Sequence, residues 1–160
     1  MNYNKKRYLE ILKVNDSRDL NIEEIRELSN YSGILNAYLD FETRHDYLQL
    51  LKEINDGKID SIIFSSKFVE RTNLNENVLK TLEENFLILS PDKKLLEKSL
   101  AFSHFIEEIL GYCYLQYEGC EIDIKKFNSP LLEAEYQASM KNIYNNMLMF
   151  LARMDKKKMN

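Results

Sequence analysis

The sequence is poor in residues that interrupt helices and in residues that build disulfide frameworks. Its 160 residues include four glycines, two prolines, two cysteines and no tryptophan. Scarce glycine and proline argue against a turn-rich β architecture and favour long, uninterrupted helices. Two cysteines fit a reducing compartment better than an oxidising one. We therefore expect a helical protein that works in a reducing environment.

Long apolar segments and a strong charge of one sign are also missing. No apolar run approaches the roughly 20 residues that span a bilayer, and the first 13 residues are too polar for a secretory signal. The net charge of −4 argues against general nucleic-acid binding. We expect no membrane contact and a cytoplasmic location, or an organelle stroma if an AT-rich organelle genome encodes the chain.

Start and stop signals divide the chain into helices. Asn21-Ile22-Glu23-Glu24 is a capping-box pattern, and Ser32-Gly33 is a plausible stop. A pause near Asp40–Thr43 precedes a second apolar stripe that ends at Asp56-Gly57. Asp60 or Ser61 then caps the next helix, for which Asn73–Asn77 predicts a break.

The second half of the chain carries two helix starts of one type. Ser90-Pro91-Asp92 combines a cap residue, proline at the first helical position and an acid in the first turn, and Ser129-Pro130 repeats the device. The first of these helices should end near Gly119. We predict an all-α fold, an antiparallel bundle of five to seven helices in a single domain, with residues 1–32 as a helical extension on a bundle of residues 34–154.

Catalytic and metal-binding motifs are scarce. Glu42 and His45 have the Glu-x-x-His spacing that places a carboxylate and an imidazole on one helix face, as in di-iron bundles, but the second pair is missing. The other histidine, His104, lies in an apolar run and is expected at the edge of the core. We therefore expect no catalytic residue, metal or cofactor, and keep a metal-dependent enzyme using Glu42 and His45 as an alternative.

Lysine and arginine are absent between Glu107 and Ile124, where carboxylates and tyrosines gather. Such a one-signed, aromatic stretch is typical of a surface that meets a basic partner. A solvated helix end followed by a loop would have the same composition. The residues predicted to bind the partner are Glu107, Glu108, Tyr114, Tyr117, Glu118, Glu121 and Asp123.

The two cysteines frame part of this acidic stretch. Cys113 and Cys120 are expected to be thiols on a helix face or in the core. A disulfide between them would require a sharp turn, for example at Gly119.

A run in the middle of the chain resembles the colicin D immunity-like family of small bacterial helical proteins. The run is Tyr47-x-x-Leu50-Leu51-x-x-Ile54-x-x-Gly57-Lys58-Ile59, followed by Phe64 and Phe68. The later long helix, the Cys120-Glu121 neighbourhood and the closing helix are similar in outline, so the resemblance covers roughly residues 47–154. It implies a compact helical bundle without catalysis, which binds a tRNA-cleaving toxin and masks its basic cleft with an acidic surface. The first 40 or so residues would be an addition to that family.

Two functional hypotheses follow besides the metal enzyme. The first is a non-enzymatic binding protein whose acidic surface docks on a basic protein, such as a nuclease toxin. The second is an assembly or structural subunit of a larger intracellular complex. In the second case, the N-terminal extension and the methionines of the last helix, including Met149 and Met154, would form the contact surfaces.

Overall fold

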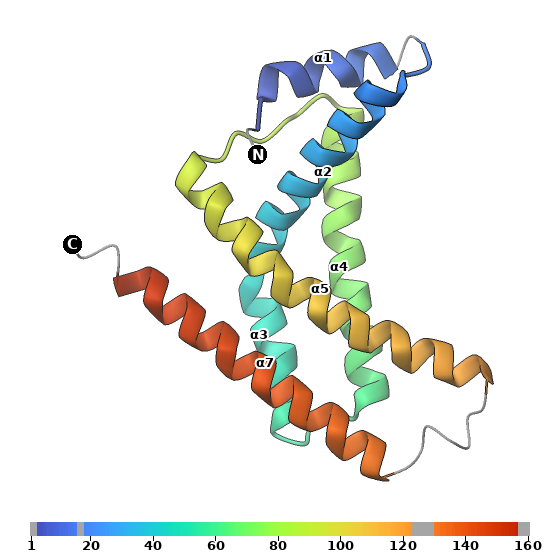
Figure 1. The fold of residues 1–160 in the computed structure, drawn as a ribbon, viewed down its shortest axis with the longest axis vertical. Helices are drawn as coiled ribbons and strands as arrows, with labels where there is room; N and C mark the ends of the chain where they lie inside the picture. The colour runs from blue at the N-terminus through green and yellow to red at the C-terminus, as the bar shows by residue number, and fades with distance from the viewer. Residues whose placement is uncertain (1–2, 16–17, 123–129, 157–160) are drawn as a thin grey trace. The chain divides into compact units, whose positions relative to one another are not determined.

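The computed structural model describes residues 3–15, 18–122 and 130–156 (Figure 1). Within these ranges the chain forms helices and no strand, which confirms the all-α prediction. The helices are α1 (Lys5–Asn15), α2 (Ile22–Glu42), α3 (Arg44–Asn55), α4 (Ser61–Glu84), α5 (Lys93–Ile122) and α7 (Pro130–Lys156).

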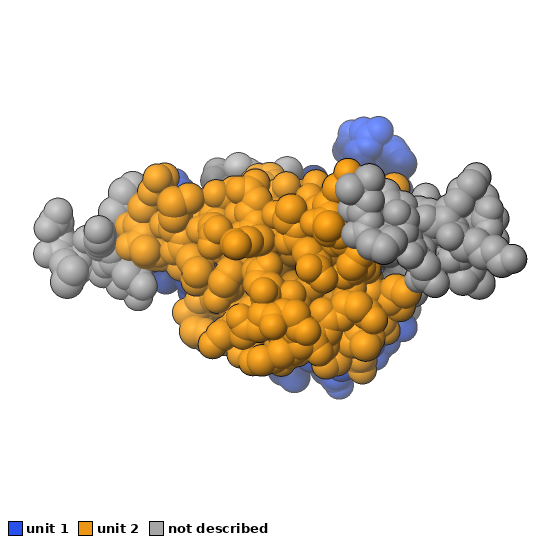
Figure 2. All heavy atoms as spheres, turned by 90° about the horizontal axis from the view of Figure 1, so that it is seen from below, with its two compact units in different colours: residues 1–42, 72–103 blue, residues 43–71, 104–160 orange. Residues whose placement is uncertain are grey.

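The chain forms two compact units, each made from two separate segments (Figure 2). Unit 1 comprises residues 1–42 and 72–103, and unit 2 comprises residues 43–71 and 104–160. Helices α4 and α5 contribute to both units. The proposed boundary at residue 33 lies inside α2 and coincides with neither unit. The assignment of the whole chain to one domain stays a prediction.

Side chains at the helix starts satisfy backbone amides that have no partner within the helix. The Oδ1 atom of Asn21 accepts from the amides of Glu23 and Glu24 at 3.0 Å each, and Glu24 Oε2 accepts from the Asn21 amide at 3.0 Å. This reciprocal arrangement confirms the predicted capping box. Arg18 adds an ion pair to Glu24 at 2.8 Å. Hydrogen bonds from Arg18 and from the Asn21 amide lower the pKa of Glu24.

The starts of α4 and α5 each have an aspartate cap, and only the start of α5 differs from the prediction. Asp60, rather than Ser61, caps α4 by accepting from the Ile63 amide at 2.8 Å. Asp92 caps α5 by accepting from the Leu95 amide at 2.9 Å, so Pro91 precedes the helix instead of opening it. Pro130 does open α7, as predicted.

Two predicted helix breaks are wrong. Helix α2 passes through Gly33 and buries Ile34 and Leu35 directly after it, and this burial outweighs the roughly 1 kcal/mol cost of a helical glycine. Helix α4 continues through Asn73–Asn77. There the buried Asn75 amide donates to the buried carboxylate of Asp40 at 2.8 Å, a tertiary contact that favours the helix.

Two helices end with the same backbone motif but with different residues. After α3, the Lys58 amide donates to the Glu53 carbonyl and the Gly57 amide donates to the Ile54 carbonyl. Gly57 has a φ of 68°, which glycine tolerates, and its predicted stop is confirmed. After α4, Leu87 and Phe86 donate to Leu82 and Glu83 in the same way.

Phe86 occupies the position that glycine takes after α3. Its φ of 55° places a bulky side chain in the left-handed region. Such a conformation costs roughly 1–2 kcal/mol for a residue with a Cβ atom. Phe86 is also 38% exposed, so burial of its ring offsets that cost only in part. The end of α4 therefore carries a strained residue in unit 1.

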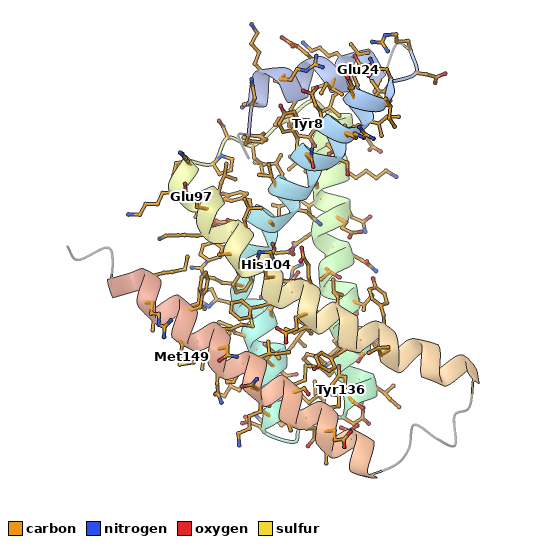
Figure 3. The ribbon with its side chains drawn as sticks, viewed as in Figure 1. Tyr8, Glu24, Glu97, His104, Tyr136 and Met149 are labelled. Atoms are coloured by element: carbon orange, nitrogen blue, oxygen red, sulfur yellow. The ribbon has the colours of Figure 1, made fainter. Side chains whose placement is uncertain are left out.

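Unit 1 has an apolar core with polar groups inside it. Tyr8, Leu12, Leu35, Leu79 and Ile88 form one buried cluster. The Tyr8 hydroxyl lies 2.9 Å from Ser32 Oγ and donates a short hydrogen bond to Glu83 Oε1, which also accepts from Ser32 at 2.7 Å. Figure 3 labels Tyr8 on the side of α1 that faces α2. This network connects α1, α2 and α4.

Unit 2 has a core dominated by aromatic rings. Tyr47 of α3 packs on Phe68 of α4 with ring centroids 5.0 Å apart, and Phe68 packs on Phe64 at 5.5 Å. Phe64 contacts Tyr136 of α7 at 6.2 Å, and Tyr136 contacts Tyr112 of α5 at 6.1 Å. These contacts connect the helical segments of unit 2 in one series, and helices α3 and α7 pack directly against each other.

Polar groups in unit 2 satisfy one another inside or beside this aromatic series. Tyr136 Oη lies 2.9 Å from Ser65 Oγ and 3.7 Å from Cys113 Sγ. Glu133 of α7 accepts from the Ser61 amide at 3.1 Å and from the Ser61 hydroxyl. A carboxylate from α7 thus satisfies the first amide of α4, where the helix dipole favours a negative charge.

Candidate functional site

Helix α5 has a buried face and a solvent face within unit 2. Ile106, Ile109 and Cys113 are buried at spacings of three and four residues, which is the helical repeat. Glu107, Glu108 and Gly111 lie between them in sequence and are exposed. The buried side chains fix the helix, and the carboxylates point to solvent from a rigid backbone.

The structure describes part of the predicted binding surface. Glu107, Glu108 and Tyr114 are exposed on α5, and we call these three residues the α5 acidic surface. Tyr117, Glu118 and Glu121 belong to the helical backbone of α5, but their side chains lie outside the described residues. Asp123 lies outside the described residues altogether. The four remain predictions as contact residues.

Aromatic and apolar side chains accompany these carboxylates. Tyr114 is 52% exposed and Leu115 is 60% exposed. Tyr112 turns the other way and packs its ring edge-on against Tyr136. Tyr112 and Tyr114 therefore lie on different faces of α5. Exposed tyrosine and leucine beside carboxylates can add apolar contact area to a charged docking surface.

His104 lies next to this surface, and its predicted place at the edge of the core is wrong. Its side chain is 79% exposed, and its Nδ1 atom is 3.5 Å from Glu107 Oε2 (Figure 3). Phe102 and Ile106, two positions before and after His104, are buried. Residues two positions apart point to nearly opposite sides of a helix, so His104 points to solvent. Helical spacing relative to those residues is the signal that could have placed His104 on the surface.

The order of charges along α5 is the reverse of what helix stability favours. The helix begins with Lys93 and Lys94, has no acidic residue in its first turn and has no basic residue in its last turn. The helix dipole favours acids near the start and bases near the end. At the start of α5, the Asp92 cap is the acidic group that interacts favourably with the helix dipole. The helix dipole therefore does not explain the carboxylates Glu107 and Glu108, which lie near the middle of α5.

The two residues of the metal-enzyme alternative lie on different helices. Glu42 is the last residue of α2, and His45 lies in the first turn of α3 after the break at Thr43, as the predicted pause requires. The Glu-x-x-His pair therefore spans the end of one helix and the start of the next. Among the described residues, no group of three or more histidine, cysteine, aspartate or glutamate side chains could hold a metal ion.

Cys113 is a free, buried thiol. Burial raises its pKa above the ordinary value, and hydrogen bonds from Tyr136 and Ser65 oppose that rise. A raised pKa keeps the group as the less reactive thiol. Helix α5 runs through Gly119 without the sharp turn that a disulfide to Cys120 would require. Cys113 is therefore part of the core rather than a reactive centre.

Comparisons with known proteins leave the function to be argued from this geometry. Protein-family models, curated proteins and solved structures give no match to the chain. The resemblance to the colicin D immunity-like family stays a prediction. None of the described helices combines the length and apolar character needed to cross a membrane.

Proposed function

We propose that this protein is a non-enzymatic binding protein that holds a basic protein partner on the α5 acidic surface. The observation that carries the proposal is the exposure of Glu107, Glu108 and Tyr114 on one helix whose opposite face is buried in unit 2. Rigid presentation lowers the entropy cost of docking, because these side chains are already held on a fixed helix. Residues 107–124 contain no lysine or arginine, so this segment supplies no lysine or arginine to neutralise its own carboxylates.

Charge order supports a binding role over a structural one. Glu107 and Glu108 lie near the middle of α5, beyond the reach of the helix dipole at either end, so they do not stabilise that helix through its dipole. Opposite charges on a partner would compensate them. Complementary charge accelerates association and selects among partners more than it raises affinity. Association should therefore slow markedly as salt rises from about 0.05 to 0.3 M, because the Debye length shortens over that range.

A charge-reversal experiment tests the proposal. Wild-type protein and the Glu107→Lys/Glu108→Lys variant would serve as baits for quantitative capture from a cell extract. The matched control is Glu70→Lys/Glu76→Lys, which reverses two exposed carboxylates on α4. Basic proteins captured by the wild type should be lost with the α5 variant and kept with the control. Identical capture by all three baits would remove the α5 acidic surface as the binding site.

The nuclease-toxin form of the proposal requires a second readout. If the captured partner is an RNA-cleaving enzyme, the wild-type protein should inhibit cleavage at a one-to-one ratio. The Glu107→Lys/Glu108→Lys variant should fail to inhibit, while Tyr114→Ala should weaken inhibition through the lost aromatic contact. A captured partner without nuclease activity would keep the binding role and remove the toxin-inhibitor role.

A second candidate function is assembly into a larger complex through α7. Leu148 and Met149 are neighbouring apolar residues of α7 that are 41% and 51% exposed. Figure 3 labels Met149 on this helix. Methionine adapts readily to different partners, which suits an assembly surface. Size-exclusion mass and co-purification of the Leu148→Ser/Met149→Ser variant test this role. A monomeric wild type that co-purifies with no subunit would exclude it.

A further inference from the structure

Unit 1 contains an open cavity that the binding function above does not use. Its volume is about 380 Å³, which lies in the range of small-molecule sites. It lies where the end of α4 meets α1 and α2. The side chains that line it and enter the argument are Leu12, Leu28, Lys80, Glu83, Glu84 and Phe86.

The polar group best fixed in this cavity is the carboxylate of Glu83. Its Oε1 atom accepts from Ser32 at 2.7 Å and from the buried Tyr8 hydroxyl. Its Oε2 atom has no hydrogen bond or ion pair to any residue that the structure describes. Two donors therefore hold the group in place and leave one oxygen available to a ligand. A preorganised acceptor binds a cation with little ordering cost.

The rest of the lining supplies an apolar wall and an excess of negative charge. Leu12 is buried and Leu28 is partly buried, so both present apolar surface. Phe86 adds an aromatic ring and holds the strained backbone conformation described above. Strain of this kind gathers at ligand sites, where the surrounding structure enforces it. An aromatic ring also attracts cations through its face.

The charges decide which ligand suits the cavity. The lining includes two carboxylates, Glu83 and Glu84, and one ammonium, Lys80. Lys80 is exposed on a flexible stem, whereas Glu83 is fixed by its donors. We propose that this cavity binds an organic cation, an ammonium or guanidinium group carried on an apolar body, with the charge at Glu83 Oε2 and the body against Leu12, Leu28 and Phe86.

Calorimetric titration with three matched probes tests the proposal. Phenethylammonium carries the charge and the apolar body, 2-phenylethanol has the same ring and chain length without charge, and 3-phenylpropionate carries the opposite charge. We expect the cation to bind with a dissociation constant on the order of a millimolar or tighter. The alcohol should bind about tenfold more weakly, and the anion should not bind. Equal binding of the cation and the alcohol, or binding of none of the three, would overturn the proposal.

Two variants separate ligand binding from folding. Glu83→Gln keeps the shape of the side chain but removes its charge, so cation affinity should fall about tenfold. Phe86→Gly removes the ring and relieves the backbone, so affinity should fall at least about threefold while the thermal midpoint is maintained. Wild-type affinity in a folded Phe86→Gly or a folded Glu83→Gln protein would contradict the assignment.

Further titrations distinguish a free amine from an arginine side chain as the source of the cation. They also distinguish the cavity of unit 1 from the α5 acidic surface. A free amine and an arginine side chain share the required chemistry, so N-acetylarginine amide is titrated beside phenethylammonium. Preference for one of them identifies the source, and failure of both refutes the site. The Glu107→Lys/Glu108→Lys variant should bind the cation as the wild type does. Loss of partner capture with retained cation binding would then concern only the α5 acidic surface.

Discussion

Both units pack aromatic rings in their cores, but the polar groups beside those rings differ. Unit 1 buries Tyr8 with a carboxylate and a serine hydroxyl as partners, and also buries the Asp40–Asn75 pair. Unit 2 buries a series of aromatic rings whose polar atoms are mainly hydroxyls and one thiol. Buried carboxylates cost free energy unless hydrogen bonds satisfy them, whereas aromatic rings gain it by burial. Unit 2 is therefore suited to rigid support of a surface, and unit 1 to a site with fixed polar groups.

Strain and open volume show the same contrast. Unit 1 has a non-glycine residue, Phe86, in the left-handed region beside its cavity. At the equivalent helix end of unit 2, Gly57 adopts that conformation without strain. Natural proteins tend to keep strained residues where a function requires them. Unit 1 therefore gives up some stability around the cavity, while unit 2 does not do so at its corresponding helix end.

The largest expected effect comes from shortening the aromatic series of unit 2. Phe68 is fully buried and contacts both Tyr47 and Phe64. Phe68→Ala should lower the free energy of unfolding by about 3–5 kcal/mol, through lost burial and the cavity left behind. Chemical denaturation monitored by circular dichroism measures this loss. The control is Ile63→Ala on the same helix segment, where the side chain is 45% exposed and the cost should stay below about 1 kcal/mol.

A cost below about 1 kcal/mol for Phe68→Ala would show that the aromatic series is not the main support of unit 2. The cores of the two units would then differ only in their buried polar groups.

Alkaline pH should destabilise both units through their buried tyrosines. Burial, with the nearby Glu83, raises the pKa of Tyr8, and burial, with the nearby Cys113, raises the pKa of Tyr136. The folded protein therefore holds these protons more tightly than the unfolded chain, whose tyrosines titrate near pH 10. Stability is fully present below about pH 10 and falls above it, by about 1.4 kcal/mol per pH unit for each such tyrosine.

Tyrosine-to-phenylalanine variants assign that alkaline loss to each unit. Tyr8→Phe and Tyr136→Phe should each reduce the slope of unfolding free energy against pH above pH 10. At neutral pH, Tyr8→Phe should cost more, because it removes a donor from the Glu83 carboxylate. The exposed Tyr114→Phe variant is the control and should keep the wild-type slope. If the slope did not change in one of these variants, that tyrosine would not contribute to the loss of stability at alkaline pH.

Local signals predicted the features that depend only on neighbouring residues. The Asn21–Glu24 capping box, the Gly57 stop and the Pro130 start follow from backbone hydrogen bonds within a few positions. The breaks at Gly33 and Asn73–Asn77 were wrong because distant residues decide those positions. Asn75, for example, donates to Asp40, which lies 35 positions earlier in the chain. No local pattern contains that contact.

The candidate sites divide in the same way. The exposure of Glu107, Glu108 and Tyr114 could be predicted because a helical repeat and a run of one charge are visible in a single segment. The cavity of unit 1 could not, because it combines residues of α1, α2 and α4 from separate parts of the sequence. The hydrogen bonds that fix Glu83 also come from residues 51 and 75 positions away.

The smallest expected effects have opposite signs at the two equivalent helix ends. Gly57→Ala should lower the free energy of unfolding by about 1 kcal/mol, since alanine is strained at this φ. A Cβ atom at Gly57 would meet no atom within 4 Å, so the backbone alone sets that cost. Phe86→Gly should leave stability unchanged or raise it by up to about 1 kcal/mol, because relief of strain offsets the lost ring contacts.

Thermal and chemical unfolding of the two variants, side by side, measure the strain held at each end. Phe86→Ala is the control that removes the ring but keeps a Cβ atom, and it should be less stable than Phe86→Gly. Both variants lack the ring, so the difference between their free energies of unfolding measures the cost of the backbone conformation at position 86. If Phe86→Gly were instead the less stable of the two, ring burial alone would explain Phe86, and the end of α4 would no longer differ from the end of α3 in stored strain.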